Sequence, residues 1–198
     1  LLMIALMPCA VWGQNLLQNP GFEPPDQGGL ADAWANNTWG NCETKFSLDE
    51  ENPHSGTTCQ KIECVRRDDG ASQFLQRIKL EAGKYYTVRL WVRASGGVPW
   101  VGATLRLVPP PYKAYLRDTI EPGRDWELLE FAGVCMEDVE DAGLFIWFQA
   151  DGSGTVWVDD ASVEAGEPPV VTGPPPEGNV VPNGSLEVEP TRTWDNMG

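Results

Sequence analysis

The chain has 198 residues, and its 29 acidic and 14 basic side chains give a formal net charge of −15 and a sequence pI of about 4.3. A protein this acidic repels phosphate, which argues against a nucleic-acid partner. It contains nine tryptophans, and because each buried indole N–H needs a hydrogen-bond partner, we expect several of them on a binding surface.

The first segment, Leu1–Gly13, is an apolar run that ends in small residues. It lacks an initiator Met and a basic start, so we interpret it as a truncated secretory signal peptide that is cleaved before Gln14. The run is too short to span a bilayer. These features predict a secreted, extracellular protein without a membrane partner.

A motif at Asn15–Glu23 recurs in outline at Asn179–Glu187, with Asn, Asn and Glu at the same spacing. The distance between the two copies fits a whole domain better than a short repeat unit. The sequence therefore predicts one domain over residues 14–166 and a Pro-rich, extended linker over 167–178. A second, similar module would begin at residue 179 and be truncated at 198.

Within the first domain, short β-like runs alternate with turn residues, and no helical periodicity is present. The pattern predicts an all-β fold, a jelly-roll β-sandwich of two antiparallel sheets. The Gly-, Pro- and Asn-rich stretch 24–41 reads as a long loop. The expected strands are Lys45–Leu48, Thr58–Val65, Gln73–Lys79, Lys84–Ala94, Val101–Val108, Trp126–Val134, Ala142–Ala150 and Thr155–Glu164.

Four cysteines lie in this domain: Cys42, Cys59, Cys64 and Cys135. An even number in an oxidising compartment favours two disulfides, and four cysteines allow three pairings. Their spacing does not suggest zinc.

Five segments occur in an order that resembles the carbohydrate-binding modules of families four, nine and twenty-two: Asn15–Glu23, Asp32–Trp34, His54–Gly56, Gly83–Val88 and Val156–Val163. The resemblance covers about residues 15–164 and implies a jelly-roll sandwich that binds a polysaccharide without catalysis. It also implies a monomeric module of a multidomain chain, beside a glycoside hydrolase domain. The cysteines and the proline run at Pro109 depart from the family pattern, so we expect an altered groove rim.

The strand alternation predicts where such a sugar would bind. On Lys84–Ala94, alternate residues point to one apolar face, while the opposite face mixes aromatic and basic side chains; Ala142–Ala150 repeats this pattern. A pyranose ring stacks its C–H face on an aromatic ring and bonds its hydroxyls to planar polar groups. If the strands are neighbours, the binding residues converge on one concave sheet. They are Tyr85, Arg89, Trp91, Arg93, Arg106, Trp147 and Gln149, with Trp39 on the rim. Alternatively, loops cover this face and its tryptophans belong to a second layer of core.

The resemblance further implies a structural calcium ion where the first and last strands meet. Glu23, Asp159 and Asp160 would supply hard carboxylate oxygens there, which Ca²⁺ prefers. Without a metal, the same residues would be solvated carboxylates at a strand end.

Two other functions remain open. The sandwich could bind another protein through its tryptophan-rich face, or it could be a lyase or hydrolase acting on polysaccharides. His54 is the only histidine, which argues against a His-based nucleophile relay or a zinc site. Paired acidic residues such as Asp68 and Asp69 read as solvated charge, because they lack the burial that raises the pKa of a general acid.

Overall fold

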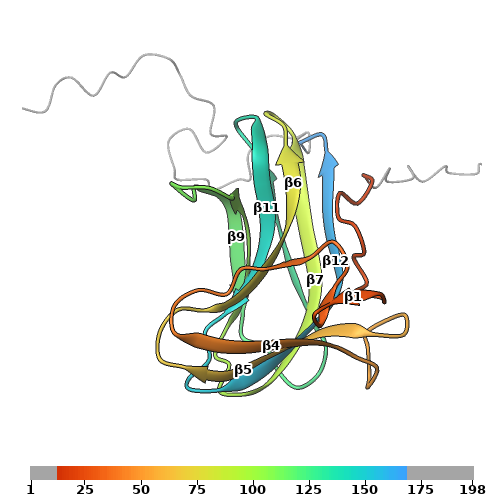
Figure 1. Ribbon diagram of the computed structural model, residues 1–198. Helices are drawn as coiled ribbons and strands as arrows, with labels where there is room; N and C mark the ends of the chain where they lie inside the picture. The colour runs from red at the N-terminus through yellow and green to blue at the C-terminus, as the bar shows by residue number, and fades with distance from the viewer. Residues whose placement is uncertain (1–12, 169–198) are drawn as a thin grey trace, which may run out of the picture. The chain divides into compact units, whose positions relative to one another are not determined.

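The computed structural model describes residues 13–168, which form a β-sandwich (Figure 1). Two five-stranded sheets have the orders β10-β7-β12-β5-β4 and β3-β6-β11-β8-β9, and every pairing is antiparallel. We call them the β7 sheet and the β11 sheet. The strands are β1 (Asp26–Gln27), β2 (Leu30–Ala31), β3 (Ala35–Asn36), β4 (Cys42–Asp49), β5 (Cys59–Arg67), β6 (Ser72–Leu80), β7 (Tyr85–Gly96), β8 (Val101–Leu107), β9 (Ala114–Ile120), β10 (Glu127–Val134), β11 (Val139–Phe148) and β12 (Gly154–Gly166).

The core lies between the two sheets and follows the period of two along each strand. On β7 the inward residues Tyr86, Val88, Leu90 and Val92 are at most 1% exposed. Leu144, Ile146 and Phe148 are their counterparts on β11. Trp34 packs at 4.9 Å from Phe22 and 5.3 Å from Phe74 (ring centroids), so this tryptophan is structural. The predicted jelly-roll sandwich is confirmed.

One irregularity lies in β12, the central strand of the β7 sheet. Asp159 pairs with Trp91 and Ser162 with Arg89, so β12 carries one extra residue between these two pairs. Such a bulge re-aims the side chains around it. Here Asp159 becomes fully buried, and Asp160 adopts a positive φ of 45°.

All eight predicted strands are present, but the structure adds four more. The predicted loop 24–41 contains the two-residue strands β1, β2 and β3. The strand β9 follows the proline run and forms the outer edge of the β11 sheet. Among residues 13–168, no helix has the length and apolar character needed to cross a membrane.

The four cysteines are free thiols in the structure, in contrast to the two disulfides expected. Cys42 and Cys64 lie on adjacent strands with their Sγ atoms 3.6 Å apart. The other two thiols have different neighbours. The Sγ atom of Cys59 contacts the Asp49 carbonyl, and the Sγ atom of Cys135 contacts the Glu137 carbonyl. The fold thus brings at most one pair of these cysteines, Cys42 and Cys64, close enough to form a disulfide.

The chain divides into two units, Leu1–Pro168 and Pro169–Gly198. The predicted signal peptide, most of the linker and the second module lie outside the described residues. Those assignments stay predictions.

Candidate carbohydrate-binding groove

The outer face of the β11 sheet carries a groove with a volume of about 770 Å³. Three aromatic side chains line it: Trp147 on the central strand, Trp39 from the segment after β3, and Tyr112 from the β8–β9 loop. Trp39 and Tyr112 are 55% and 54% exposed. The remaining lining residues are Asn37, Ala71, Gln73, Thr104, Arg106, Val108, Ala114, Arg117 and Gln149.

Trp147 is held in place by its two neighbours on β8. It pairs with Gly102, and a Cβ atom on that glycine would lie only 2.4 Å from two atoms of the indole. The indole therefore covers the backbone of Gly102, which only glycine permits. Its Nε1 donates a hydrogen bond of 3.2 Å to Thr104 Oγ1. Together these contacts fix an aromatic surface before any ligand arrives.

Arg106 lies on the same face of β8 as Thr104, two residues further along the strand. Its guanidinium carbon is 3.6 Å from the ring centroid of Phe145 and 5.0 Å from that of Tyr112. Phe145 is only 1% exposed although it points outward from the sheet, because Arg106 covers it. Burial lowers the pKa of Arg106 from its ordinary value, but an arginine stays charged at neutral pH.

The groove gathers four of the eight predicted sugar-binding residues: Trp39, Arg106, Trp147 and Gln149. The prediction that the residues of the β7 strand converge with Arg106, Trp147 and Gln149 on one sheet is wrong. The strands β7 and β11 belong to different sheets, because β7 is bonded to β10 and β12, whereas β11 is bonded to β6 and β8. Tyr85, Arg89, Trp91 and Arg93 therefore lie on the outer face of the β7 sheet.

On that other face, the predicted stacking surface of Trp91 is already covered. The ring of His54 lies over it with a centroid distance of 4.0 Å and an angle of 16°. Arg93 stacks 4.2 Å from the Trp157 ring centroid and donates to the Glu51 carbonyl. Arg89 is paired with Glu130. This face is occupied by the chain's own contacts.

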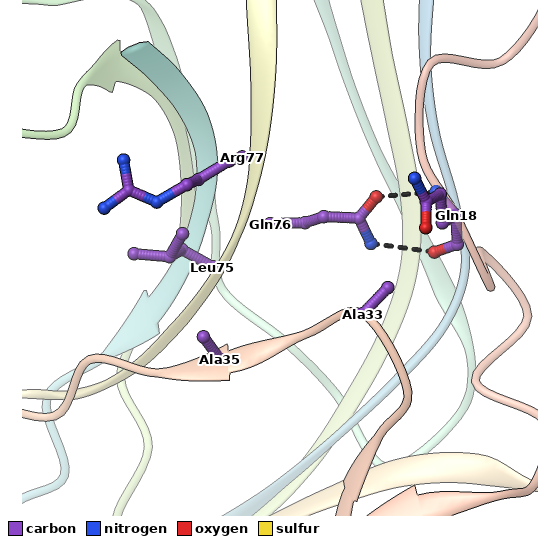
Figure 2. A pocket seen from close by; sticks show the side chains of 6 residues that line it. All are labelled: Gln18, Ala33, Ala35, Leu75, Gln76 and Arg77. Carbon is purple, nitrogen blue, oxygen red and sulfur yellow. Dashed lines mark hydrogen bonds between the residues drawn. The ribbon is translucent and has the colours of Figure 1, made fainter.

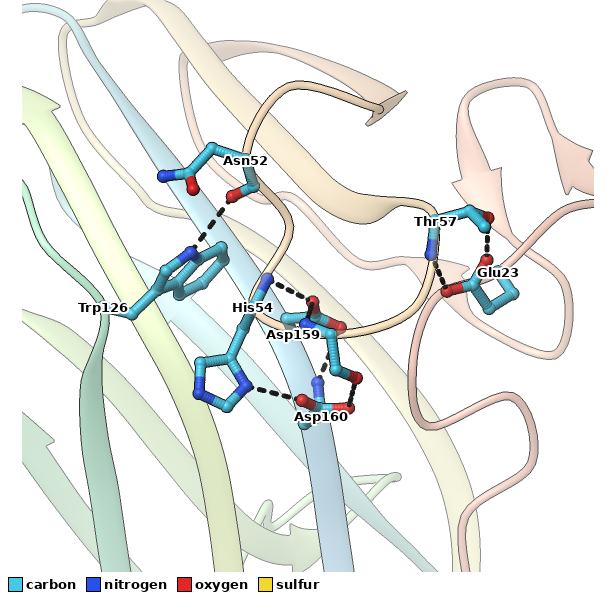
Figure 3. Close-up of polar contacts among 8 residues, drawn as sticks. Glu23, Asn52, His54, Thr57, Trp126, Asp159 and Asp160 are labelled. Atoms are coloured by element: carbon cyan, nitrogen blue, oxygen red, sulfur yellow. Dashed lines mark hydrogen bonds and ion pairs between the residues drawn. The ribbon is translucent and has the colours of Figure 1, made fainter.

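The loop between β4 and β5 makes the cover, and it is pinned to the bulge of β12 (Figure 3). The N–H groups of His54 and Ser55 donate to Asp159 Oδ2 at 2.8 and 3.1 Å. The His54 ring is 2.6 Å from Asp160 Oδ2. Burial raises the pKa of Asp159 to about 6, against the opposing effect of these N–H donors.

Glu23, the third predicted calcium ligand, meets the same loop further along (Figure 3). Its carboxylate accepts from the Thr57 N–H at 2.8 Å and from the Thr57 hydroxyl. Although burial acts to raise the pKa of Glu23, these hydrogen bonds lower it overall. A Cβ on Gly21 would lie 3.9 Å from Asp160 Oδ1 and 4.0 Å from Glu23 Cγ. The side chains of Glu23 and Asp160 thus both lie close to Gly21.

Three carboxylates contact the β4–β5 loop, Glu23 at Thr57 and both Asp159 and Asp160 at His54, and carboxylate oxygens are ligands that a hard cation prefers. Within residues 13–168, however, no group of three or more His, Cys, Asp and Glu side chains is arranged to hold a metal. A Ca²⁺ ion bound at Glu23 or Asp160 would need backbone carbonyls to complete its ligands. It would supply positive charge that links the β4–β5 loop to the N-terminal segment.

A smaller cavity of about 280 Å³ lies at the other margin of the β11 sheet, beside β3 and β6 (Figure 2). The side chain of Gln76 forms one wall. It accepts from the Gln18 N–H at 2.6 Å and donates to the Gln18 carbonyl at 2.7 Å. These two hydrogen bonds resemble those between paired strands, and they join the N-terminal segment to β6.

Several groove residues were missed by the sequence reasoning. Tyr112 follows the proline run directly, and an exposed aromatic in such a loop was a usable signal. Arg117 could be found only by recognising β9, whose alternation is weak. Gln73 was read as an ordinary strand residue; it enters the groove because it pairs with Trp147.

Comparison with known proteins identifies a family for most of this domain. Residues 14–152 match the sequence profile of the family CBM_4_9, described as a carbohydrate-binding domain. No curated protein matches the chain significantly.

Solved structures of similar fold include one titled "CBM4 structure and function" (20% identity, TM-score 0.56, covering 75% of this chain and 99% of that one). A second, TmCBM61 in complex with β-1,4-galactotriose, is 19% identical with a TM-score of 0.55 and coverages of 76% and 97%. A third, a cyclase from Fischerella sp. TAU, is 12% identical with a TM-score of 0.62 and coverages of 81% and 100%. At these identities the likeness concerns the fold alone. The family match over residues 14–152 shows more: the chain belongs to the carbohydrate-binding domain family CBM_4_9.

Proposed function

We propose that this protein is a non-catalytic, secreted module that holds a polysaccharide chain in the groove of the β11 sheet. Trp39, Tyr112 and Trp147 supply its aromatic lining. The observation that carries the proposal is the indole of Trp147 held over Gly102, because a sugar ring stacks on a fixed aromatic face without loss of side-chain freedom. Polar side chains around it, such as Gln73 and Gln149, suit sugar hydroxyls.

The β7 sheet is the less suitable face for a sugar. His54 covers Trp91, and Arg93 already stacks between Trp126 and Trp157. A sugar would have to displace these contacts before it could bind. The groove needs no such rearrangement.

Affinity electrophoresis through gels that contain glucans, xylans, mannans, galactans or uronate-bearing polymers tests the proposal, with calorimetry on oligosaccharides of the polymer that retards the protein. We expect at least one polymer to retard the chain and Trp147→Ala to reduce the retardation. Failure of every polymer to bind would overturn the proposal. Reducing-sugar or unsaturated-product release from the same polymers would show that the module is an enzyme instead.

We also propose a structural calcium ion at the edge formed by Glu23, Asp160 and the β4–β5 loop, and attachment of the module to a glycoside hydrolase in the full protein. The contacts that the carboxylates of Glu23 and Asp160 make with the same β4–β5 loop support the first point. The family membership supports the second, since such modules serve to hold a catalytic domain on its polymer. Chelation and sequencing of the complete coding region test them separately.

A further inference from the structure

The charged residues that line the groove are both arginines, Arg106 and Arg117, and no aspartate or glutamate lines it. The chain as a whole carries 29 acidic and 14 basic side chains. A lining drawn at random from such a composition would be acidic. The groove is therefore a basic strip on an acidic protein.

Neither arginine is used to balance a carboxylate of the protein. Among the ion pairs within residues 13–168, seven join a lysine or arginine to a carboxylate, and none of them includes Arg106 or Arg117. Arg106 lies over the rings of Phe145 and Tyr112 and takes part in none of the side-chain hydrogen bonds found within residues 13–168, so its N–H groups are available to a ligand. A guanidinium with available N–H groups can bind a planar anion through two parallel hydrogen bonds.

The sheet register places the second arginine on the same surface. On β9, Arg117 pairs with Thr104 of β8. On β8, Arg106 lies two residues after Thr104, so its side chain points to the same face of the sheet. The two arginines thus lie on the same face of the sheet, on the adjacent strands β9 and β8.

The acidic residues close to the strip are turned away or neutralised. Asp118 follows Arg117 on β9 and so points to the opposite side of the strand. Asp141, whose carbonyl accepts the Val108 N–H at one end of the groove, is ion paired with Arg77. More distant carboxylates are screened, because the Debye length is about 8 Å at physiological ionic strength.

We infer that the groove binds an anionic polysaccharide, whose carboxylate or sulfate groups pair with Arg106 and Arg117 while a sugar ring stacks on Trp147. This rests on the proposed function and names the class of its ligand. The arginines select the charge and the indole selects the sugar, so neither a neutral glycan nor a simple anion satisfies both.

Matched polymers test the inference on the full chain. Polygalacturonan is compared before and after methyl esterification of its carboxylates, and a sulfated galactan before and after desulfation, by calorimetry or affinity electrophoresis at low and at physiological salt. We expect the charged form of one pair to bind about tenfold or more tightly than its neutral form, and its affinity to fall as salt rises. The pair that shows this preference identifies carboxylate or sulfate as the recognised group.

Single charge removals locate the effect. Arg117→Gln, at an exposed position, and Arg106→Gln should each reduce affinity for the charged polymer about tenfold and remove much of the salt dependence. Arg124→Gln is the matched control, because it removes the same charge from an exposed loop residue that does not line the groove. It should leave both affinity and salt dependence unchanged.

The outcomes separate the two proposals. Equal binding of the charged and neutral forms, with Trp147→Ala still weakening it, would overturn the charge preference and leave the sugar-binding function in place. Charged polymers that bind equally well to Arg117→Gln and Arg106→Gln would also overturn the inference. Binding of no polymer at all would overturn the proposed function itself.

Discussion

At the scale of the single residue, the two exposed-face tryptophans Trp91 and Trp147 have opposite situations. Both point outward from the middle of a sheet, and both have a planar group close to the indole. For Trp91 that group is the His54 ring, which occupies the face a sugar would use. For Trp147 it is the bare backbone of Gly102, on the side away from solvent. Sugar binding should therefore depend on only one of them.

Trp147→Ala should weaken polysaccharide binding by ~1–2 kcal/mol, about 5- to 30-fold in Kd, because it removes the stacking surface. Calorimetry with a binding oligosaccharide measures this loss. Trp91→Ala is the matched control: it should lower the Tm, since His54 loses its stacking partner, but leave Kd unchanged. The reverse pattern would place the binding surface on the β7 sheet.

At the scale of the element, the bulge in β12 and the loop between β4 and β5 act together. The bulge buries Asp159, and the N–H groups of the loop converge on that carboxylate. The loop in turn covers Trp91. A cation at Glu23 and Asp160 would reinforce the same connection.

Chelation should therefore lower the Tm, and added Ca²⁺ should restore it. An ion at one hundred times its dissociation constant stabilises the folded state by about 2.7 kcal/mol. Asp160→Asn keeps a hydrogen-bonding group but loses the charge, so it should abolish the response in differential scanning fluorimetry. Trp147→Ala should retain it. A Tm that ignores the chelator, in protein shown to be metal-free, would exclude the site.

The strand pair β4 and β5 carries a second testable connection. With Sγ atoms 3.6 Å apart, Cys42 and Cys64 should form a disulfide when the folded protein is treated with glutathione disulfide, which takes up the two electrons released. Burial raises the pKa of Cys64 to about 11, so the more exposed Cys42 should react first.

Alkylation followed by peptide mapping checks the pairing. Cys59 and Cys135 should be recovered as alkylated thiols, and Cys42→Ser should leave Cys64 alkylated too. A bond between Cys59 and Cys135 would contradict the fold described here.

The sequence predicts the main strands but not which strands pair with one another. Alternation along β7 and β11 correctly separated inward from outward residues, because the side-chain period of a strand is local. Which strand lies beside which depends on pairing between distant segments, and so Trp91 and Trp147 were wrongly placed together. The bulge at Asp159 and the strand β9 were missed for related reasons. A bulge is defined by its partner strand, and β9 has little alternation of its own.

At the scale of the whole molecule, the sandwich of residues 13–168 has a hydrophobic core of its own. The inward faces of both sheets are filled by residues 13–168. A fragment of residues 14–166 should therefore unfold in one cooperative transition and bind its polysaccharide with the Kd of the full chain. Circular dichroism melts and calorimetry on both proteins measure this. A fragment that folds but binds more weakly would mean that residues beyond 166 contribute to the ligand site.

The contact between Trp147 and Gly102 also constrains how this protein can diverge. Any side chain at position 102 would push the indole off the sheet, so the glycine is dispensable only after the tryptophan has gone. We therefore expect an ordered history among descendants of this groove: loss at position 147 first, and substitution at position 102 afterwards. A homologue that combines Trp at 147 with a larger residue at 102 must hold its indole in another orientation, and its ligand would have to approach along a different line.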